Sequence, residues 1–247
     1  MLKHQSHPVI ISDIDNTLLG DADGLNEFLA YLHQADRSFS FGIATGRRLD
    51  SARSVLEEWR VAPKPDIFIT SVGSEIYYGP NLERDNDWIK HINYGWEPEK
   101  LREVLLARFE GLQLQPDIDQ REFKVSFFVD QAFEQSLPKL ERCLQQNNLL
   151  ANVIYSHGQF LDLLPIKASK GLAVRHIAAR WGLPMRQFLV AGDSGNDEEM
   201  LNSDALGVVV GNYSTELEKL KGKPGIYFAK DHYALGILEG IRAFSFL

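Results

Sequence analysis

The sequence has little cysteine, no dense basic segment and no long hydrophobic run. Its one cysteine, Cys143, excludes an internal disulfide and fits a reducing compartment. No apolar run approaches the ~18 residues that cross a bilayer, and the first eight residues, MLKHQSHP, lack the apolar segment of a secretory signal. The formal net charge is −8, which disfavours nucleic acid and anionic membranes as partners. We therefore expect a soluble, cytoplasmic protein.

The first third of the chain alternates strand and helix patterns. Apolar residues predict strands at 9–12, 39–45 and 66–72, and helical spacing of apolar residues predicts helices at 24–35 and 48–61. Strands that alternate with helices are typical of βαβ units and a parallel sheet. The chain of 247 residues is long enough to add a smaller inserted unit to such a core.

The pattern changes in the middle of the chain and then returns. Residues 85–164 predict a loop, two helices and several short strands, which is typical of a small α+β unit with an antiparallel sheet. Strand patterns at 188–193 and 207–211 resume the first rhythm. We therefore predict an α/β fold with a doubly wound parallel-sheet core, residues 1–84 and 165–247, and an inserted α+β domain at 85–164.

Two acidic residues directly follow the first predicted strand. In VIISDIDNTL (9–18), four apolar or small residues run into Asp13 and Asp15, and Thr17 follows. Neighbouring like charges hinder each other's ionisation unless a cation lies between them. Ligands and catalytic groups gather at the carboxyl ends of strands in open α/β sheets. The motif predicts a nucleophile and an acid/base group beside a metal.

Two further segments allow a phosphate-binding role or a simpler one. Thr45 and Gly46 follow the second predicted strand, where a hydroxyl and a free N–H can hold a phosphate oxygen, or where Thr45 can cap the next helix. Lys170 begins a predicted helix, a position opposed by the helix dipole, so it pairs with an anion or is simply solvated. Lys167 is the competing lysine.

The segment VAGDSGNDEEM (190–200) is more specific than these two. An apolar strand ends in Asp193, and Asn196 and Asp197 open the next helix. Carboxylate and amide oxygens are the ligands that Mg²⁺ prefers. The segment predicts a second acidic strand end that contributes to the same metal site.

Together these motifs resemble the haloacid dehalogenase superfamily of phosphotransferases. The likeness covers DxDxT at 13–17, then Thr45, Lys170 and GDxxND at 192–197. The insert is similar to the type-C2 cap of that superfamily. The segments SVGSEIYYGP (71–80), KVSFFVD (124–130), FLDLLPIKASKG (160–171) and AGDSGNDEEML (191–201) resemble the sucrose-phosphate phosphatase branch, and the likeness runs over nearly the whole chain.

The resemblance implies a role for each motif residue. Asp13 attacks phosphorus and Asp15 transfers protons, while Thr45, the N–H of Gly46 and Lys170 bind the phosphate. Asp197 orients Lys170 or a metal-bound water, and Asn196 contacts the phosphate or supports its loop. The implied cofactor is Mg²⁺, and its site involves Asp13, Asp15 (through the backbone carbonyl), Asp193 and Asp197.

The substrate implied by the resemblance is sucrose 6-phosphate. Mannosylfructose phosphate, glucosylglycerol phosphate and mannosylglycerate phosphate are alternatives that differ only in contacts with the cap. Residues such as Lys124 and Ser126 also alternate with apolar residues as on any half-exposed strand, so a purely structural role stays open. The candidate substrate ligands are Arg47, Arg48, Ser74, Glu75, Lys124, Ser126, Asn152 and His157.

Two other functional classes compete with a phosphatase. One is a phosphoglucomutase of the same fold, which the type and position of the insert argue against. The other is a non-catalytic regulatory domain associated with a sucrose-phosphate synthase, which would usually lack one of the catalytic carboxylates. We expect a monomer, with a sugar phosphate as its substrate and a sucrose-phosphate synthase as a candidate partner.

Overall fold

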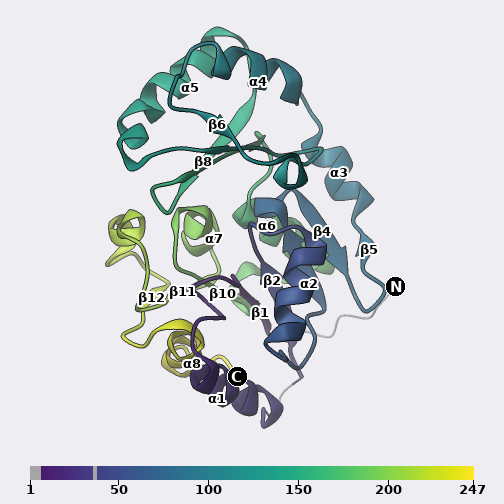
Figure 1. Cartoon of the computed structure of the whole chain (residues 1–247). Helices are drawn as coiled ribbons and strands as arrows, with labels where there is room; N and C mark the ends of the chain where they lie inside the picture. The colour runs from purple at the N-terminus through teal and green to yellow at the C-terminus, as the bar shows by residue number, and fades with distance from the viewer. Residues whose placement is uncertain (1–6, 36–37) are drawn as a thin grey trace.

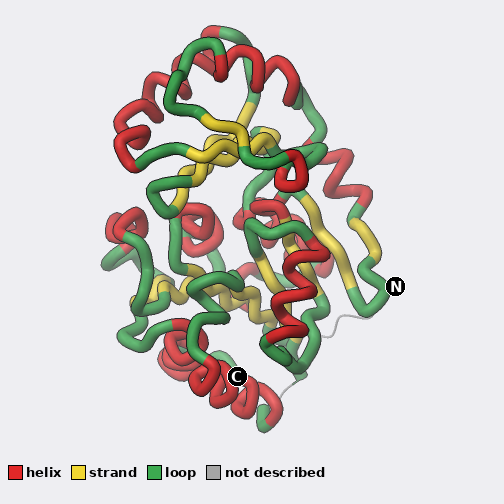
Figure 2. The backbone as a smooth tube through the Cα atoms, in the orientation of Figure 1, coloured by secondary structure: helices red, strands yellow, loops and turns green. Residues whose placement is uncertain are grey.

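The structure is a computed structural model and describes residues 7–35 and 38–247. Part of the expectation about the N-terminal segment therefore falls on residues 1–6, outside the described residues. The described part of the chain folds into two sheets, one above the other in Figures 1 and 2. No helix in the described ranges is long and apolar enough to cross a membrane.

The larger sheet has eight strands in the order β12-β11-β10-β1-β2-β3-β4-β5. The strands from β12 to β3 pair in parallel, whereas β4 and β5 are antiparallel additions at one edge. The strands are β1 (Val9–Ser12), β2 (Ser40–Ala44), β3 (Ile67–Thr70), β4 (Glu75–Tyr78), β5 (Glu83–Arg84), β10 (Phe188–Gly192), β11 (Leu206–Val209) and β12 (Ile226–Phe228).

Helices cover both faces of the larger sheet because its central strands are apolar on both sides. Along β1, Val9 and Ile11 enter one hydrophobic cluster and Ile10 enters the other. A strand buried on both faces reads as a continuous apolar run, as in parallel sheets. The first cluster contains residues of α3 (Asn86–Ile92), α6 (Lys170–Trp181) and α7 (Glu198–Leu201), and the second those of α1 (Ala22–His33), α2 (Leu49–Glu58) and α8 (Tyr233–Ala243).

The smaller sheet has four antiparallel strands in the order β6-β7-β9-β8. Its apolar face packs with two helices in a third cluster that includes Val125, Phe127 and Cys143. The alternate positions Ser126 and Asp162 lie on the opposite face of the sheet. The elements are β6 (Gln113–Leu114), β7 (Val125–Phe128), β8 (Ala151–Ser156), β9 (Phe160–Pro165), α4 (Pro98–Leu106) and α5 (Leu137–Gln146).

The two sheets confirm the predicted α/β architecture, and some elements differ locally. The stretch after residue 85 is predicted as a loop but forms α3, because Asp85 accepts hydrogen bonds from the amides of Asp87 and Trp88 and Trp88 is buried in the core. Strand β12 is also missing from the prediction, since its three half-buried residues carry too short a pattern.

Candidate active site

Three neighbouring strands bring the predicted motifs together. Strand β1 lies between β2 and β10, and all three run in parallel. Asp13, Thr45 and Asp193 each follow the last residue of one of these strands. The carboxyl ends of parallel strands meet at one edge, so segments far apart in the sequence form one site.

Lys170 occupies the centre of this site. It is fully buried, and its Nζ lies 3.1 Å from Oδ1 of Asp13 and 2.7 Å from Oδ1 of Asp197. Burial alone would lower the pKa of Lys170, but attraction to Asp13 and Asp197 raises it above its usual range. A charged lysine at a helix start therefore has the two anions that this position requires. The competing Lys167 instead lies 5.0 Å above the ring of Tyr94.

Asp197 is committed to holding other groups in place. One oxygen accepts from Lys170, and the other accepts from the amides of Asp193 (3.1 Å) and Ser194 (3.2 Å). This carboxylate fixes the lysine and the loop after β10 at the same time. The orienting role implied for Asp197 stays a prediction.

The donor set at this edge fits a divalent cation that prefers oxygen. Asp13, Asp193 and Asp197 each offer a carboxylate oxygen, and these atoms lie within 4.8 Å of one another. Oδ1 of Asn196, which is buried, has no hydrogen-bond partner among the described residues. A cluster of buried oxygen acceptors with one of them unsatisfied suits Mg²⁺.

The electrostatics of the cluster point the same way. Burial raises the pKa of Asp193 to about 7, with a further increase from Asp197, although a hydrogen bond from Thr17 (2.7 Å) opposes it. Burial also raises the pKa of Asp13 well above its usual value, against the attraction of Lys170. Buried carboxylates with raised pKa values at a cleft are typical of functional sites.

Asp15 faces a different partner from Asp13. Both of its oxygens accept hydrogen bonds from the guanidinium of Arg47, each at 2.7 Å, and Arg47 also donates to Ser51. The hydrogen bond with Asp15 raises the pKa of Arg47. The side chain of Asp15 is 45% exposed, whereas that of Asp13 is 6% exposed.

A cavity of about 520 Å³ opens above Asp13 and Asp15, between the two sheets. This volume is in the range of small-molecule sites. The core contributes Asp13, Asp15, Asn16, Gly46, Arg47, Arg48, Ser51 and Asn196, and the smaller sheet with its loops contributes Gln115, Ile118, Asp119, Lys124, Phe128, Ser156, His157, Gln159, Phe160 and Asp162.

The upper wall combines polar groups with aromatic rings. Asp162 accepts a hydrogen bond from Ser126 at 2.5 Å, and Nζ of Lys124 lies 3.7 Å from the same oxygen. The rings of Phe128 and Phe160 lie 6.0 Å apart beside them. Polar groups beside an aromatic surface are typical of sites for hydroxyl-rich ligands.

Four predicted substrate ligands lie outside the lining of this cavity. Ser74 donates to the carbonyl oxygen of Ser71, and Asn152 donates to that of Ala168. Ser126 donates to Asp162, and Glu75 accepts hydrogen bonds from within the protein. This geometry does not support a ligand role for these four residues. The other four candidates line the cavity, namely Arg47, Arg48, Lys124 and His157.

The cavity also contains residues that the sequence analysis missed. Asp162 faces it from the middle of β9, directly opposite Ser126 of β7. The alternation in FLDLLP places this acid on the same face as Phe160, so strand parity could have found it. Gln115, Asp119 and Gln159 lie outside regular strands and carry no such signal.

The chain matches proteins that act on sugar phosphates. Sucrose-phosphatase 1 of Nicotiana tabacum is 32% identical over 96% of this chain, but the match spans only 59% of the tobacco protein. The mannosylfructose-phosphate phosphatase of Agrobacterium fabrum is 30% identical over 95% of both chains. The chain thus spans about three-fifths of the plant relatives and nearly all of the bacterial one.

A solved structure agrees with this match. The sucrose-phosphatase of Synechocystis sp. PCC6803, solved in complex with sucrose and phosphate, superposes with a TM-score of 0.92 at 33% identity, covering 98% of this chain and all of the other. The family described as sucrose-6F-phosphate phosphohydrolase matches residues 6–245. With the strand-end carboxylates and the buried lysine in place, the chain belongs to the sucrose-6F-phosphate phosphohydrolase family.

Proposed function

We propose that the protein is a Mg²⁺-dependent phosphatase that hydrolyses sucrose 6-phosphate to sucrose and phosphate. The observation that carries this proposal is the buried Asp13–Lys170–Asp197 group at the base of a cavity with a polar and aromatic upper wall. Family membership and the likeness to a protein solved with sucrose and phosphate support the same substrate.

Asp13 is the nucleophile in this mechanism. Its carboxylate attacks phosphorus in line, the bond between phosphorus and the sugar oxygen breaks, and an aspartyl phosphate forms. Water then attacks this phosphorus, releases phosphate and restores the Asp13 carboxylate. Asp13 and Asp193, with the backbone carbonyl of Asp15, would hold Mg²⁺, which when bound offsets the charges of carboxylate and phosphate.

Asp15 transfers the protons of both steps. It protonates the departing sugar oxygen and then accepts a proton from the attacking water. The guanidinium of Arg47 holds this carboxyl group beside the cavity through two hydrogen bonds.

The phosphate oxygens are bound by groups from three segments. Lys170, the hydroxyl of Thr45 and the N–H of Gly46 stabilise the charge that spreads over these oxygens in a loose transition state. Asn196 also lines the cavity, and its Nδ2 group is the atom that can donate to a phosphate oxygen.

The smaller sheet, from β6 to β9, acts as the cap that selects the sugar. Lys124, Asp162 and His157 bind sugar hydroxyls, and the Phe128–Phe160 surface lies along the ring faces. Mannosylfructose phosphate is the second candidate substrate, because a mannosylfructose-phosphate phosphatase is 30% identical over nearly all of both chains. The phosphate-binding residues of the core would bind the phosphate group of sucrose 6-phosphate and that of mannosylfructose phosphate in the same way.

The setting of the reaction is also a proposal. The single cysteine supports a reducing compartment, so we infer that the enzyme is cytoplasmic. We further infer that the enzyme is a monomer whose active site is formed by one chain. A sucrose-phosphate synthase is its candidate partner, since that enzyme makes the substrate.

A panel of sugar phosphates tests the proposal. Phosphate release is measured with Mg²⁺ and with EDTA for sucrose 6-phosphate, mannosylfructose phosphate, glucosylglycerol phosphate, mannosylglycerate phosphate and glucose 6-phosphate. We expect the highest kcat/KM with sucrose 6-phosphate and no turnover in EDTA. Equal rates with glucose 6-phosphate would reject the sucrose assignment, and absence of turnover with every ester would reject a phosphatase.

A further inference from the structure

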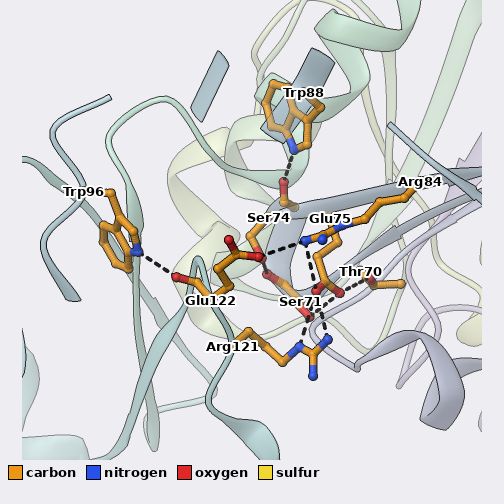
Figure 3. A network of polar contacts seen from close by, with 10 residues as sticks. Thr70, Ser71, Ser74, Glu75, Arg84, Trp88, Trp96, Arg121 and Glu122 are labelled. Carbon is orange, nitrogen blue, oxygen red and sulfur yellow. Dashed lines mark hydrogen bonds and ion pairs between the residues drawn. The ribbon is translucent and has the colours of Figure 1, made fainter. Parts of the chain in front are cut away.

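Glu75 connects the core to the cap without lining the cavity. It lies on β4, is 3% exposed, and its two oxygens have different partners (Figure 3). Oε1 accepts from Arg121 of the cap at 3.0 and 3.3 Å, and Oε2 accepts from the hydroxyls of Thr70 (3.0 Å) and Ser71 (3.2 Å) in the core. One carboxylate therefore bridges the two parts of the molecule.

On the core side, this bridge ends at a strained turn, residues 71–73, which lies next to the segment of Thr45 and Gly46. Ser71 and Val72 have positive φ angles of 52° and 60°, which are unfavourable for residues with a side chain. Their amides donate to the carbonyl oxygens of Arg47 (2.8 Å) and Thr45 (3.0 Å). The turn thus supports the segment whose hydroxyl and N–H face the phosphate.

The same turn also supports the start of α6. Gly73, with a φ of 99°, packs so closely on Ser169 and Lys170 that a Cβ would lie 2.2 Å from the carbonyl carbon of Ser169. The indole of Trp88 donates to the carbonyl oxygen of Gly73 at 3.1 Å. A shift of the turn would therefore move both phosphate-binding segments.

The cap side of the bridge leads to the sugar wall. Arg121 and Lys124 exchange backbone hydrogen bonds of 3.0 and 3.2 Å, and Lys124 lines the cavity. The hydrogen bond to Glu75 raises the pKa of Arg121 although burial lowers it. Arg84 of β5 approaches Glu75 only to 4.0 Å and pairs with Glu122 at 3.4 Å. Arg121 is thus the cap's direct contact with this carboxylate.

We propose that Glu75 is a positioning residue that couples the sugar wall of the cap to the phosphate-binding segments of the core, through Arg121 on one side and the Ser71–Gly73 turn on the other. This inference rests on the proposed function for its substrate. A disaccharide phosphate occupies both ends of the cavity and depends on their relative position. A small ester such as p-nitrophenyl phosphate occupies the core end alone.

The test compares kcat/KM for the best disaccharide phosphate with kcat/KM for p-nitrophenyl phosphate in the same preparation. This ratio is independent of the amount of folded enzyme, so a merely structural defect does not move it. We expect the ratio to fall about tenfold in Arg121→Met and in Glu75→Gln, and Arg121→Lys to recover part of it. Arg84→Met is the matched control and should change the ratio less than about twofold.

The double variant Glu75→Gln/Arg121→Met decides whether the two residues act together. Coupling predicts that it lowers the ratio no further than either single variant, because the same contact is already lost. A full second tenfold loss would mean independent effects and would overturn the proposal. An unchanged ratio in Arg121→Met would overturn it as well.

Amide hydrogen exchange tests the coupling without any substrate. We expect Arg121→Met, a change in the cap, to increase exchange in a peptide covering residues 67–76 of the core, whereas Arg84→Met leaves it unchanged. Unchanged exchange in Arg121→Met would overturn the coupling. A wild-type enzyme that hydrolyses no ester would reject the proposed function alone, and exchange would still decide the coupling.

Discussion

The two ends of the cavity are built in different ways. At the core end, Lys170 and Asp197 are fully buried and bonded to each other and to the backbone. At the cap end, Phe128 is 39% exposed, and the polar groups stand on the open face of an antiparallel sheet. The core end is fixed by parallel strands that are packed on both faces. The cap end stands on a four-stranded sheet that packs against helices on one face only.

This difference separates the chemistry from the choice of substrate. Every candidate ester has the same phosphate group, and the core end presents groups for that part alone. The candidates differ in their sugars, which would meet the cap wall. A substitution at the core end should therefore affect all esters, and one at the cap end should affect them unequally.

The largest effect is expected from Asp13→Asn at the core end. An amide cannot attack phosphorus, so phosphate release should fall about 10⁴-fold for every ester. The measurement is kcat with sucrose 6-phosphate and with p-nitrophenyl phosphate, and circular dichroism serves as the control for folding. Retention of more than a few per cent of activity with either ester would contradict the role of Asp13.

Asp15→Asn should distinguish the two esters within the core end. An alkoxide leaving group needs a proton, whereas p-nitrophenolate leaves without one, so the first step should slow about 10²- to 10³-fold with a sugar phosphate and far less with p-nitrophenyl phosphate. A burst of p-nitrophenolate in stopped flow would report the fast first step. Affinity for Mg²⁺, measured by calorimetry, should change little. Equal slowing of the first step with both esters would exclude Asp15 as the acid.

Lys124→Met examines the cap end. Loss of a charged donor that is buried on the sugar wall should lower kcat/KM for sucrose 6-phosphate about 10- to 100-fold, with a smaller loss for p-nitrophenyl phosphate. Lys167→Met is the matched control, because this lysine lies over the ring of Tyr94. An equal loss with both esters would break the division between the two ends.

Asp85→Asn should affect the stability of the protein more than its activity at either end of the cavity. Asp85 caps α3 and accepts hydrogen bonds from Tyr78 (2.8 Å) and His176 (3.0 Å). Loss of this buried acceptor should lower the free energy of unfolding by about 2–4 kcal/mol at pH 7, as measured by urea denaturation. The kcat should stay within about twofold of wild type, since Asp85 lies outside the lining of the cavity.

The same variant has a defined pH dependence. Burial would raise the pKa of Asp85, but hydrogen bonds from His176, the Trp88 amide and Tyr78 hold it well below its usual range. A lowered folded-state pKa gives stability that is fully present above the unfolded value of about 3.9 and is lost as the pH falls. The stability difference between wild type and variant should therefore shrink from pH 6 to pH 3. A constant difference would contradict this assignment.

The sequence was informative where a local pattern determines position. Asp13, Thr45 and Asp193 each follow an apolar strand, and parallel strands place their carboxyl ends together regardless of what lies between them. For Lys170 the helix start allowed either an anion partner or a solvated lysine, and the family resemblance favoured the anion partner. These rules need no knowledge of side-chain orientation.

Other features depend on tertiary contacts that no local pattern contains. Glu75 follows the turn after β3, so it could have faced the cavity, but its strand position directs it to Arg121, which lies 46 residues away. The pair of Arg47 with Asp15 likewise joins two loops that only the fold brings together. Helix α3 depends on the cap that Asp85 provides and on space for Trp88 in the core.

The position of β1 has a consequence for the order of synthesis. Thr17, which lies four residues after Asp13, donates to Asp193, which is 176 positions later in the chain. A ribosome therefore releases the segment of Asp13 long before its partner strand β10 exists, and contacts so distant in sequence form late in folding. A nascent chain carries Asp13 without the lysine and acids that complete the site. The proposed hydrolytic activity would therefore begin only when both halves of the core have been made and have assembled beside the cap.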